Sequence, residues 1–109
     1  MATDAEYAAY AMGQIRGIPN LTHRKMFGEY AVYVGEKVVA LLADNQFFLK
    51  PTEGSRSMLG TPVEAPPYPG AKNCYVLDEV LDDPDMMTNL IRITERELPP
   101  PRPKKKQKI

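Results

Sequence analysis

The chain has one cysteine, one histidine and no tryptophan among its 109 residues. A single cysteine, Cys74, cannot form an intramolecular disulfide, and small secreted domains usually depend on disulfides. Because the sequence has only one cysteine and one histidine, Cys74 and His23, it lacks the cysteine and histidine ligands of a structural zinc site. Cys74 lies in the apolar run Asn-Cys-Tyr-Val-Leu, which favours a buried structural thiol over a reactive one.

Long hydrophobic runs are missing as well. No window approaches the roughly 18 apolar residues of a membrane span. The first residues, Met-Ala-Thr-Asp-Ala-Glu, are acidic where a signal peptide is basic. We therefore expect a cytoplasmic protein with no membrane segment, folded as one domain.

The formal net charge of zero conceals an uneven distribution. The segment 99–109 is rich in proline and carries five cations, namely Arg102, Lys104, Lys105, Lys106 and Lys108. The other nine basic residues stand against all 14 acidic ones, so the body carries −5. We expect a folded domain over residues 1–98 and a disordered basic tail over 99–109.

Two segments have helical signals. Thr3 and Glu6 have the spacing of a capping box, which predicts a helix over residues 4–16 that ends near Gly17. Asp83 before Pro84 is a helix start signal for a second helix that ends at the prolines from 99 onward. Its apolar face is predicted at helical spacing to hold Met87, Leu90, Ile91, Thr94 and Leu98.

Between them, residues 23–50 alternate with the period of strands. Gly35-Glu36 suits a type II′ hairpin turn, and Asp44-Asn45 a second tight turn. Strands are expected before Gly35, over 37–43 and over 46–50, with 37–43 central and covered on both faces. Thr52 can cap a short helix that runs through Leu59. Residues 61–70 are expected to form an extended proline-rich connection. Residues 72–77 are predicted to form another strand, and Glu79–Leu81 a helical turn. The fold class is α+β: an antiparallel sheet of four or more strands, a three-stranded meander plus a later strand, packed with N- and C-terminal helices.

No catalytic pattern is present. The seven glycines form neither GxGxxG nor a Walker loop. The acids Asp82, Asp83 and Asp85 fit a helix start, where carboxylates complement the dipole. We expect no enzyme activity, no metal and no cofactor.

One segment, Arg24-Lys25-Met26-Phe27-Gly28-Glu29-Tyr30, is dense in charged and aromatic groups around a glycine. Gly28 within a strand pattern predicts a bulge that kinks the first strand. One interpretation is a purely structural kink with an Arg–Glu surface pair. The other is a binding edge, where Arg24 and Lys25 meet an anionic partner, with Phe27, Gly28, Glu29 and Tyr30 beside them. Tyr68 and Lys72 join these candidates, because with Tyr30 they are expected to border a pocket.

The motif Met26–Tyr30, with Gly35–Ala40, Asp44–Lys50 and Ala65–Lys72, resembles the TfoX (Sxy) N-terminal domain family over residues 4–98. The resemblance implies a compact α+β domain. It also implies a kinship with bacterial regulators of natural competence, of which this chain resembles a single-domain member without the C-terminal domain of helix-hairpin-helix type.

Three functional hypotheses follow. The first is a noncatalytic regulatory interaction domain that binds a protein partner near transcription, a homodimer being one such arrangement. The second is a nucleic-acid accessory protein that uses the basic tail, whose cations would release counterions from phosphates. The third is a small-ligand-binding domain.

Overall fold

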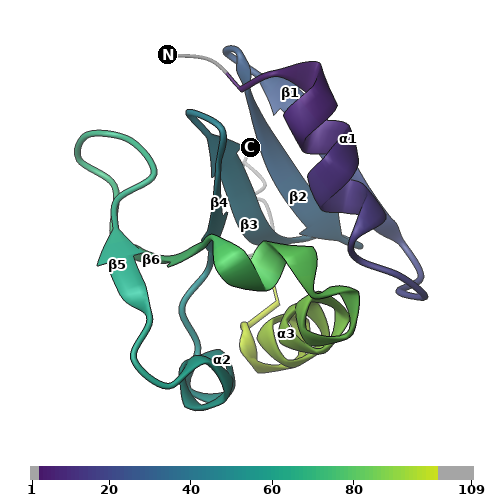
Figure 1. Cartoon of the computed structure of the whole chain (residues 1–109), viewed down its shortest axis with the longest axis vertical. Helices are drawn as coiled ribbons and strands as arrows, with labels where there is room; N and C mark the ends of the chain where they lie inside the picture. Colours follow the sequence, from purple (N-terminus) through teal and green to yellow (C-terminus); the bar gives the residue numbers. More distant parts are fainter. Residues whose placement is uncertain (1–2, 101–109) are drawn as a thin grey trace, which may run out of the picture.

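A computed structural model describes residues 3–100 of the chain. Its elements run in the order α1 (Ala5–Gly13), β1 (Leu21–Met26), β2 (Glu29–Val34), β3 (Lys37–Ala43), β4 (Gln46–Leu49), α2 (Glu53–Leu59), β5 (Val63–Ala65), β6 (Cys74–Leu77), η1 (Glu79–Asp82) and α3 (Pro84–Glu97). All strands form one antiparallel sheet in the order β1-β2-β3-β4-β6-β5 (Figure 1). This confirms the α+β class.

One face of the sheet, here the helix face, carries the main core. Figure 1 shows α1 in front of β1 and β2, with α3 lower on the same side. The strands contribute Val32, Leu42, Phe47 and Leu49 to this core, and every one of them is fully shielded from solvent. The predicted buried face of α3 is confirmed, since Met87, Leu90, Ile91 and Thr94 have no exposed surface.

The opposite face, here the open face, has a smaller core. Strand alternation places Ala43, Phe48 and Cys74 on this side, buried together, with Leu41, Ala65 and Val76 partly buried against them. The prediction that residues 37–43 are covered on both faces therefore holds only in part. Within residues 3–100, the helices pack on the helix face, and none of them lies over the half of the open face formed by β1, β2 and β3 (Figure 1).

Several local signals act as expected. Gly35 has φ +62°, as the first central position of a type II′ turn requires. Asp44 and Asn45 both have positive φ. Thr52 accepts a hydrogen bond from the Ser55 N–H, and the Asp83 side chain accepts one from the Met86 N–H, so both helix caps are confirmed. The helical turn expected after residue 78 is η1.

The prediction of a capping box at the first helix is wrong. Asp4 is the N-cap and makes no side-chain cap. Thr3 instead donates its hydroxyl hydrogen to Glu29 Oε1 (2.6 Å) and accepts from the Asn45 N–H (3.2 Å). A tertiary partner has replaced the local one, and the helix ends at Gly13 rather than residue 16.

The predicted kinked strand is also wrong. Phe27 and Gly28 are the two turn residues of a hairpin between β1 and β2, with Met26 paired to Glu29. The meander therefore has four strands rather than three. A register shift lies elsewhere, at Val32/Tyr33 opposite β3.

Two boundaries differ on the far edge. The proline-rich connection contains the short strand β5, which pairs Val63 with Val76 and Ala65 with Cys74. The strand expected from residue 72 begins at Cys74. Three residues are too few for a period-two pattern to show in the sequence.

Candidate functional site

The tip of the β1–β2 hairpin presents a large apolar side chain to solvent. Phe27 is 100% exposed and has φ +52°, and the next residue, Gly28, has φ +80°. Positive φ is costly for a residue with a Cβ atom, and hairpin turns of this kind normally use asparagine, aspartate or glycine. Phe27 thus serves neither the core nor the turn.

Strand alternation separates the charged residues of the segment. Arg24 pairs with Ala31 and projects from the open face, where its guanidinium lies 5.5 Å from the centre of the Tyr33 ring. Lys25 pairs with Tyr30 on the helix face. Arg24 and Lys25 therefore point to opposite sides of the sheet and do not share one surface.

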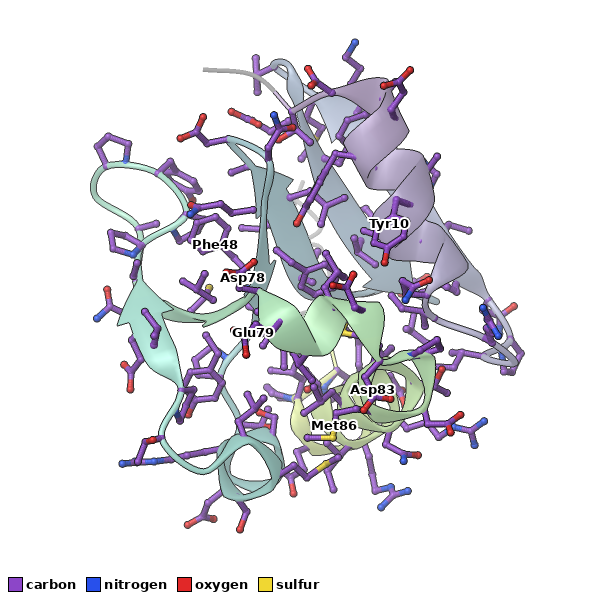
Figure 2. All side chains as sticks on the ribbon, in the orientation of Figure 1. Tyr10, Phe48, Asp78, Glu79, Asp83 and Met86 are labelled. Carbon is purple, nitrogen blue, oxygen red and sulfur yellow. The ribbon has the colours of Figure 1, made fainter. Side chains whose placement is uncertain are left out.

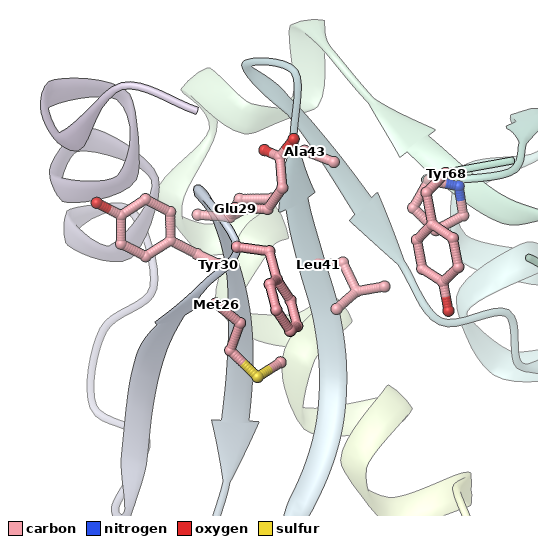
Figure 3. A pocket seen from close by; sticks show the side chains of 9 residues that line it. Met26, Glu29, Tyr30, Leu41, Ala43 and Tyr68 are labelled. Atoms are coloured by element: carbon pink, nitrogen blue, oxygen red, sulfur yellow. The ribbon is translucent and has the colours of Figure 1, made fainter. Parts of the chain in front are cut away.

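A cavity of about 440 Å³ lies on the open face beside the hairpin tip. Its walls include Met26, Phe27, Leu41, Ala43 and Tyr68. Figure 3 shows Leu41 pointing from the sheet toward Tyr68, with Met26 on the hairpin side. Met26 is 41% and Tyr68 60% exposed, so the rim is apolar and open to solvent.

Tyr30 and Glu29 also border this cavity, but in different ways. The Tyr30 ring turns toward α1 (Figure 3), where it is 8% exposed within the main core and 5.6 Å from the His23 ring. Glu29 is the only carboxylate lining the cavity among residues 3–100.

The Glu29 carboxylate holds the hairpin tip against the neighbouring turn. Its Oε1 accepts from the Thr3 hydroxyl and from the Asp44 N–H (3.1 Å). The Thr3 N–H donates to the Gly28 carbonyl (2.9 Å). The turn that presents Phe27 is thereby tied to both the N-terminal segment and the β3–β4 turn.

The loop between β5 and β6 forms the far wall. Pro67 and Tyr68 line the cavity, and Lys72 lines an adjoining hollow with Tyr68, Leu41 and Cys74. Tyr68 is therefore shared between the two hollows, and Lys72 belongs only to the second. Cys74 is 4% exposed, and burial raises the pKa of its thiol more than nearby Lys50 lowers it. This confirms the buried thiol.

A second polar cluster lies where α1 meets η1. Figure 2 shows Tyr10 on α1 near η1, and its hydroxyl donates to Asp82. That hydrogen bond raises the pKa of Tyr10. Burial, and then the charge of Asp78, raises the pKa of Tyr7 to about 12. These groups join α1 to the rest of the domain, and Tyr7 and Asp78 line a small hollow of about 220 Å³ there.

Within residues 3–100, no group of three or more histidine, cysteine, aspartate or glutamate side chains could hold a metal ion. In the same range, no helix is long and apolar enough to cross a membrane. The five cations of the predicted nucleic-acid tail, Arg102 to Lys108, lie outside the described residues.

Sequence reasoning missed Met26, Leu41 and Ala43 as parts of the site. Strand alternation by itself places Met26 on the same face as Arg24, and a turn at Phe27-Gly28 then pairs that face with Ala31 on β2. Continuing the alternation through Ala31 and its partner Leu41 would then have identified that face as apolar.

Comparison with known proteins agrees with this architecture. The family model described as the TfoX N-terminal domain matches residues 13–98. A protein of Spirochaeta aurantia, described as an uncharacterized 12.7 kDa protein in the trpE 5′ region, is 45% identical over 105 residues, covering 96% of this chain and 91% of that protein. The chain belongs to the TfoX N-terminal domain family.

Proposed function

We propose that this domain is a noncatalytic regulatory module that binds a protein partner through the open face at the hairpin tip. The observation that carries the proposal is Phe27, fully exposed and held at positive φ beside an apolar cavity. A side chain that stabilises neither the core nor its own turn, in a place where strain accumulates, suggests selection for contact with another molecule.

The chemistry of the cavity supports an apolar protein contact. Its walls are mainly hydrophobic, and the Glu29 carboxylate is already engaged by Thr3 and Asp44. Large aromatic side chains and methionine are enriched at protein interfaces, where they dominate the binding energy. Family membership supports a regulatory role, near transcription or competence.

The test compares three baits, the wild type and two variants, in affinity capture from an extract of the organism that encodes the protein. Phe27→Asn removes the exposed ring while suiting the turn, because asparagine tolerates positive φ. Val63→Thr is the matched control, since Val63 is 67% exposed on the same face but at the far edge, on β5. We expect a partner retained by wild type and Val63→Thr and lost by Phe27→Asn. The same proteins recovered with all three baits would refute the role of this surface.

A small apolar ligand is the second candidate, because about 440 Å³ falls within the usual range of ligand pockets. A thermal-shift screen of a metabolite library on wild type and Phe27→Asn separates it from the first. Stabilisation by a compound in both proteins favours the ligand, and no stabilisation by any compound removes this candidate.

The tail hypothesis has its own test. Deleting residues 99–109 should abolish binding to nucleic acid and its salt dependence if the five cations make the contact. Binding that survives the deletion with the same salt dependence would contradict it.

A further inference from the structure

The surface around Phe27 has the properties of one that pairs with a copy of itself. A twofold interface needs a single patch that is complementary to itself, so that whatever protrudes on one copy meets a recess on the other. Phe27 protrudes without any covering, and the cavity over Leu41 and Ala43 lies next to it. The protruding Phe27 ring (the knob) and the cavity (the hole) are therefore neighbours on the same patch.

The charges beside the patch are arranged in the same way. Arg24, on β1, lies on one side of Phe27 on the open face. Asp44, at the β3–β4 turn, lies beyond β2 in the sheet order and lines a second hollow that shares Glu29 and Tyr68 with the cavity. A twofold axis between Phe27 and the cavity would bring Arg24 of one copy toward Asp44 of the other, and the reverse.

From this geometry we infer that a second copy of the chain occupies the site, with Phe27 of each protomer inserted in the cavity of its partner. The inference rests on the proposed function, because it uses the same surface. It states that a second copy of the chain occupies this surface when no other partner is bound. Dimerisation then covers the patch, and any other partner has to compete with it.

The exposed area sets the expected strength. Phe27 in full, with the exposed parts of Tyr68 and Met26, offers about 400 Å² of largely apolar surface per copy, given the size of such side chains. Two copies with their charged rims approach about 1,200 Å², the lower limit of specific interfaces. A dissociation constant in the micromolar range is expected.

The measurement is the concentration-dependent mass of the purified full chain, by sedimentation equilibrium from about 1 to 500 μM. Phe27→Asn should weaken association about 1,000-fold, because the axis removes one hot spot twice, each worth about 30-fold. Val63→Thr should dimerise as wild type does. A thermal melt of each variant checks folding, and Phe27→Asn should melt no lower than wild type.

Mixing two variants tests the reciprocal arrangement. Tyr68→Asp damages the hole at an exposed loop position, and Phe27→Asn removes the knob. Neither variant should dimerise alone, but a mixture retains one intact knob and hole. The mixture should therefore associate about 30-fold more tightly than either variant by itself.

A wild-type protein that stays monomeric at 500 μM, or a dimer that Phe27→Asn leaves intact, would overturn the inference. A monomer with nuclear Overhauser contacts between the Phe27 ring and the tail prolines would assign the site to residues 99–109 instead and would equally overturn it. Capture of another protein that depends on Phe27 would still support the proposed function, so that the two can fail separately.

Discussion

Replacing Thr94 by valine should make the domain more stable. Thr94 lies on the buried face of α3 with 0% exposure, and its Oγ1 has no hydrogen-bond partner among the described residues. A hydroxyl buried without a partner loses its hydration and gains nothing in return. Valine has nearly the same shape, so the substitution exchanges the hydroxyl for a methyl group without opening a cavity.

The size of the effect follows from three terms. An unsatisfied buried polar group costs about 1–3 kcal/mol. The added methyl group contributes less than about 1 kcal/mol by burial. Threonine and valine have nearly equal helix propensity, so that term cancels. We expect the free energy of unfolding to rise by about 1.5 kcal/mol, which for a domain of this size raises Tm by about 5–10 °C.

Urea unfolding and thermal melts followed by circular dichroism measure this directly. Thr88 provides a matched control on the same helix, because its Oγ1 accepts a hydrogen bond from the Arg16 N–H at 2.9 Å. Thr88→Val should therefore lower stability, by about 1 kcal/mol. The two substitutions are chemically identical and should have opposite signs. If Thr94→Val is as destabilising as Thr88→Val, the Thr94 hydroxyl has a partner in solution and the reasoning fails.

Three further predictions follow from the helices. A Cβ atom at Gly54 would lie 2.6 Å from Ile93 Cγ1. Gly54→Ala should therefore lower the free energy of unfolding by about 2 kcal/mol, measured by urea unfolding, although alanine favours helix. An unchanged urea midpoint would mean that α2 can move away from α3. Asp83→Ala removes the N-cap of α3 and should lower stability by about 1 kcal/mol in a thermal melt, whereas Asp83→Asn keeps a capping oxygen and should be nearly neutral. Equal losses of stability in both variants would show that the charge of Asp83, and not its capping hydrogen bond, is what matters. The pKa of Tyr7 is about 12 in the folded state against 10.0 in the unfolded state, so the stability that depends on its neutral form is present below pH 10 and is lost as pH rises toward 12. The free energy of unfolding of Tyr7→Phe should therefore fall less steeply over this pH range than that of the wild type, and parallel curves of unfolding free energy against pH would contradict the prediction.

Much of the fold could be predicted because its signals are local. The hairpin turns at Gly35-Glu36 and Asp44-Asn45 depend on residues that tolerate positive φ, and the turn residues themselves show it. The start of α3 depends on Asp83 and the proline after it. The hairpin at Phe27-Gly28 is not predictable from local signals, because phenylalanine is an unusual residue at a turn position of positive φ.

The candidate site could be predicted only in its members and not in its arrangement. Phe27, Glu29, Tyr30 and Tyr68 were among the predicted residues, and all line one cavity. Lys25 was grouped with Arg24, yet strand alternation sends it to the other face once the true turn is known. Tyr68 lies at least 25 positions after the wall residues that come from the β1–β2 hairpin and from β3, and only the pairing of β4 with β6 brings its loop to them.

The sequence by itself determined the family, the buried face of α3 and most of the secondary-structure elements, with the β1–β2 hairpin and β5 as exceptions, because turn chemistry, capping and hydrophobic period act over a few residues. The tertiary structure alone decided the partners of Thr3 and Glu29, which lie 26 positions apart. It also decided that none of the helices within residues 3–100 covers the β1–β3 half of the open face. Such features depend on strand order and on which helix packs where, and these are set by the burial of the whole chain. Phe27 is a candidate contact from the sequence, but only the fold shows that its side chain is fully exposed, which makes it the centre of the proposed surface.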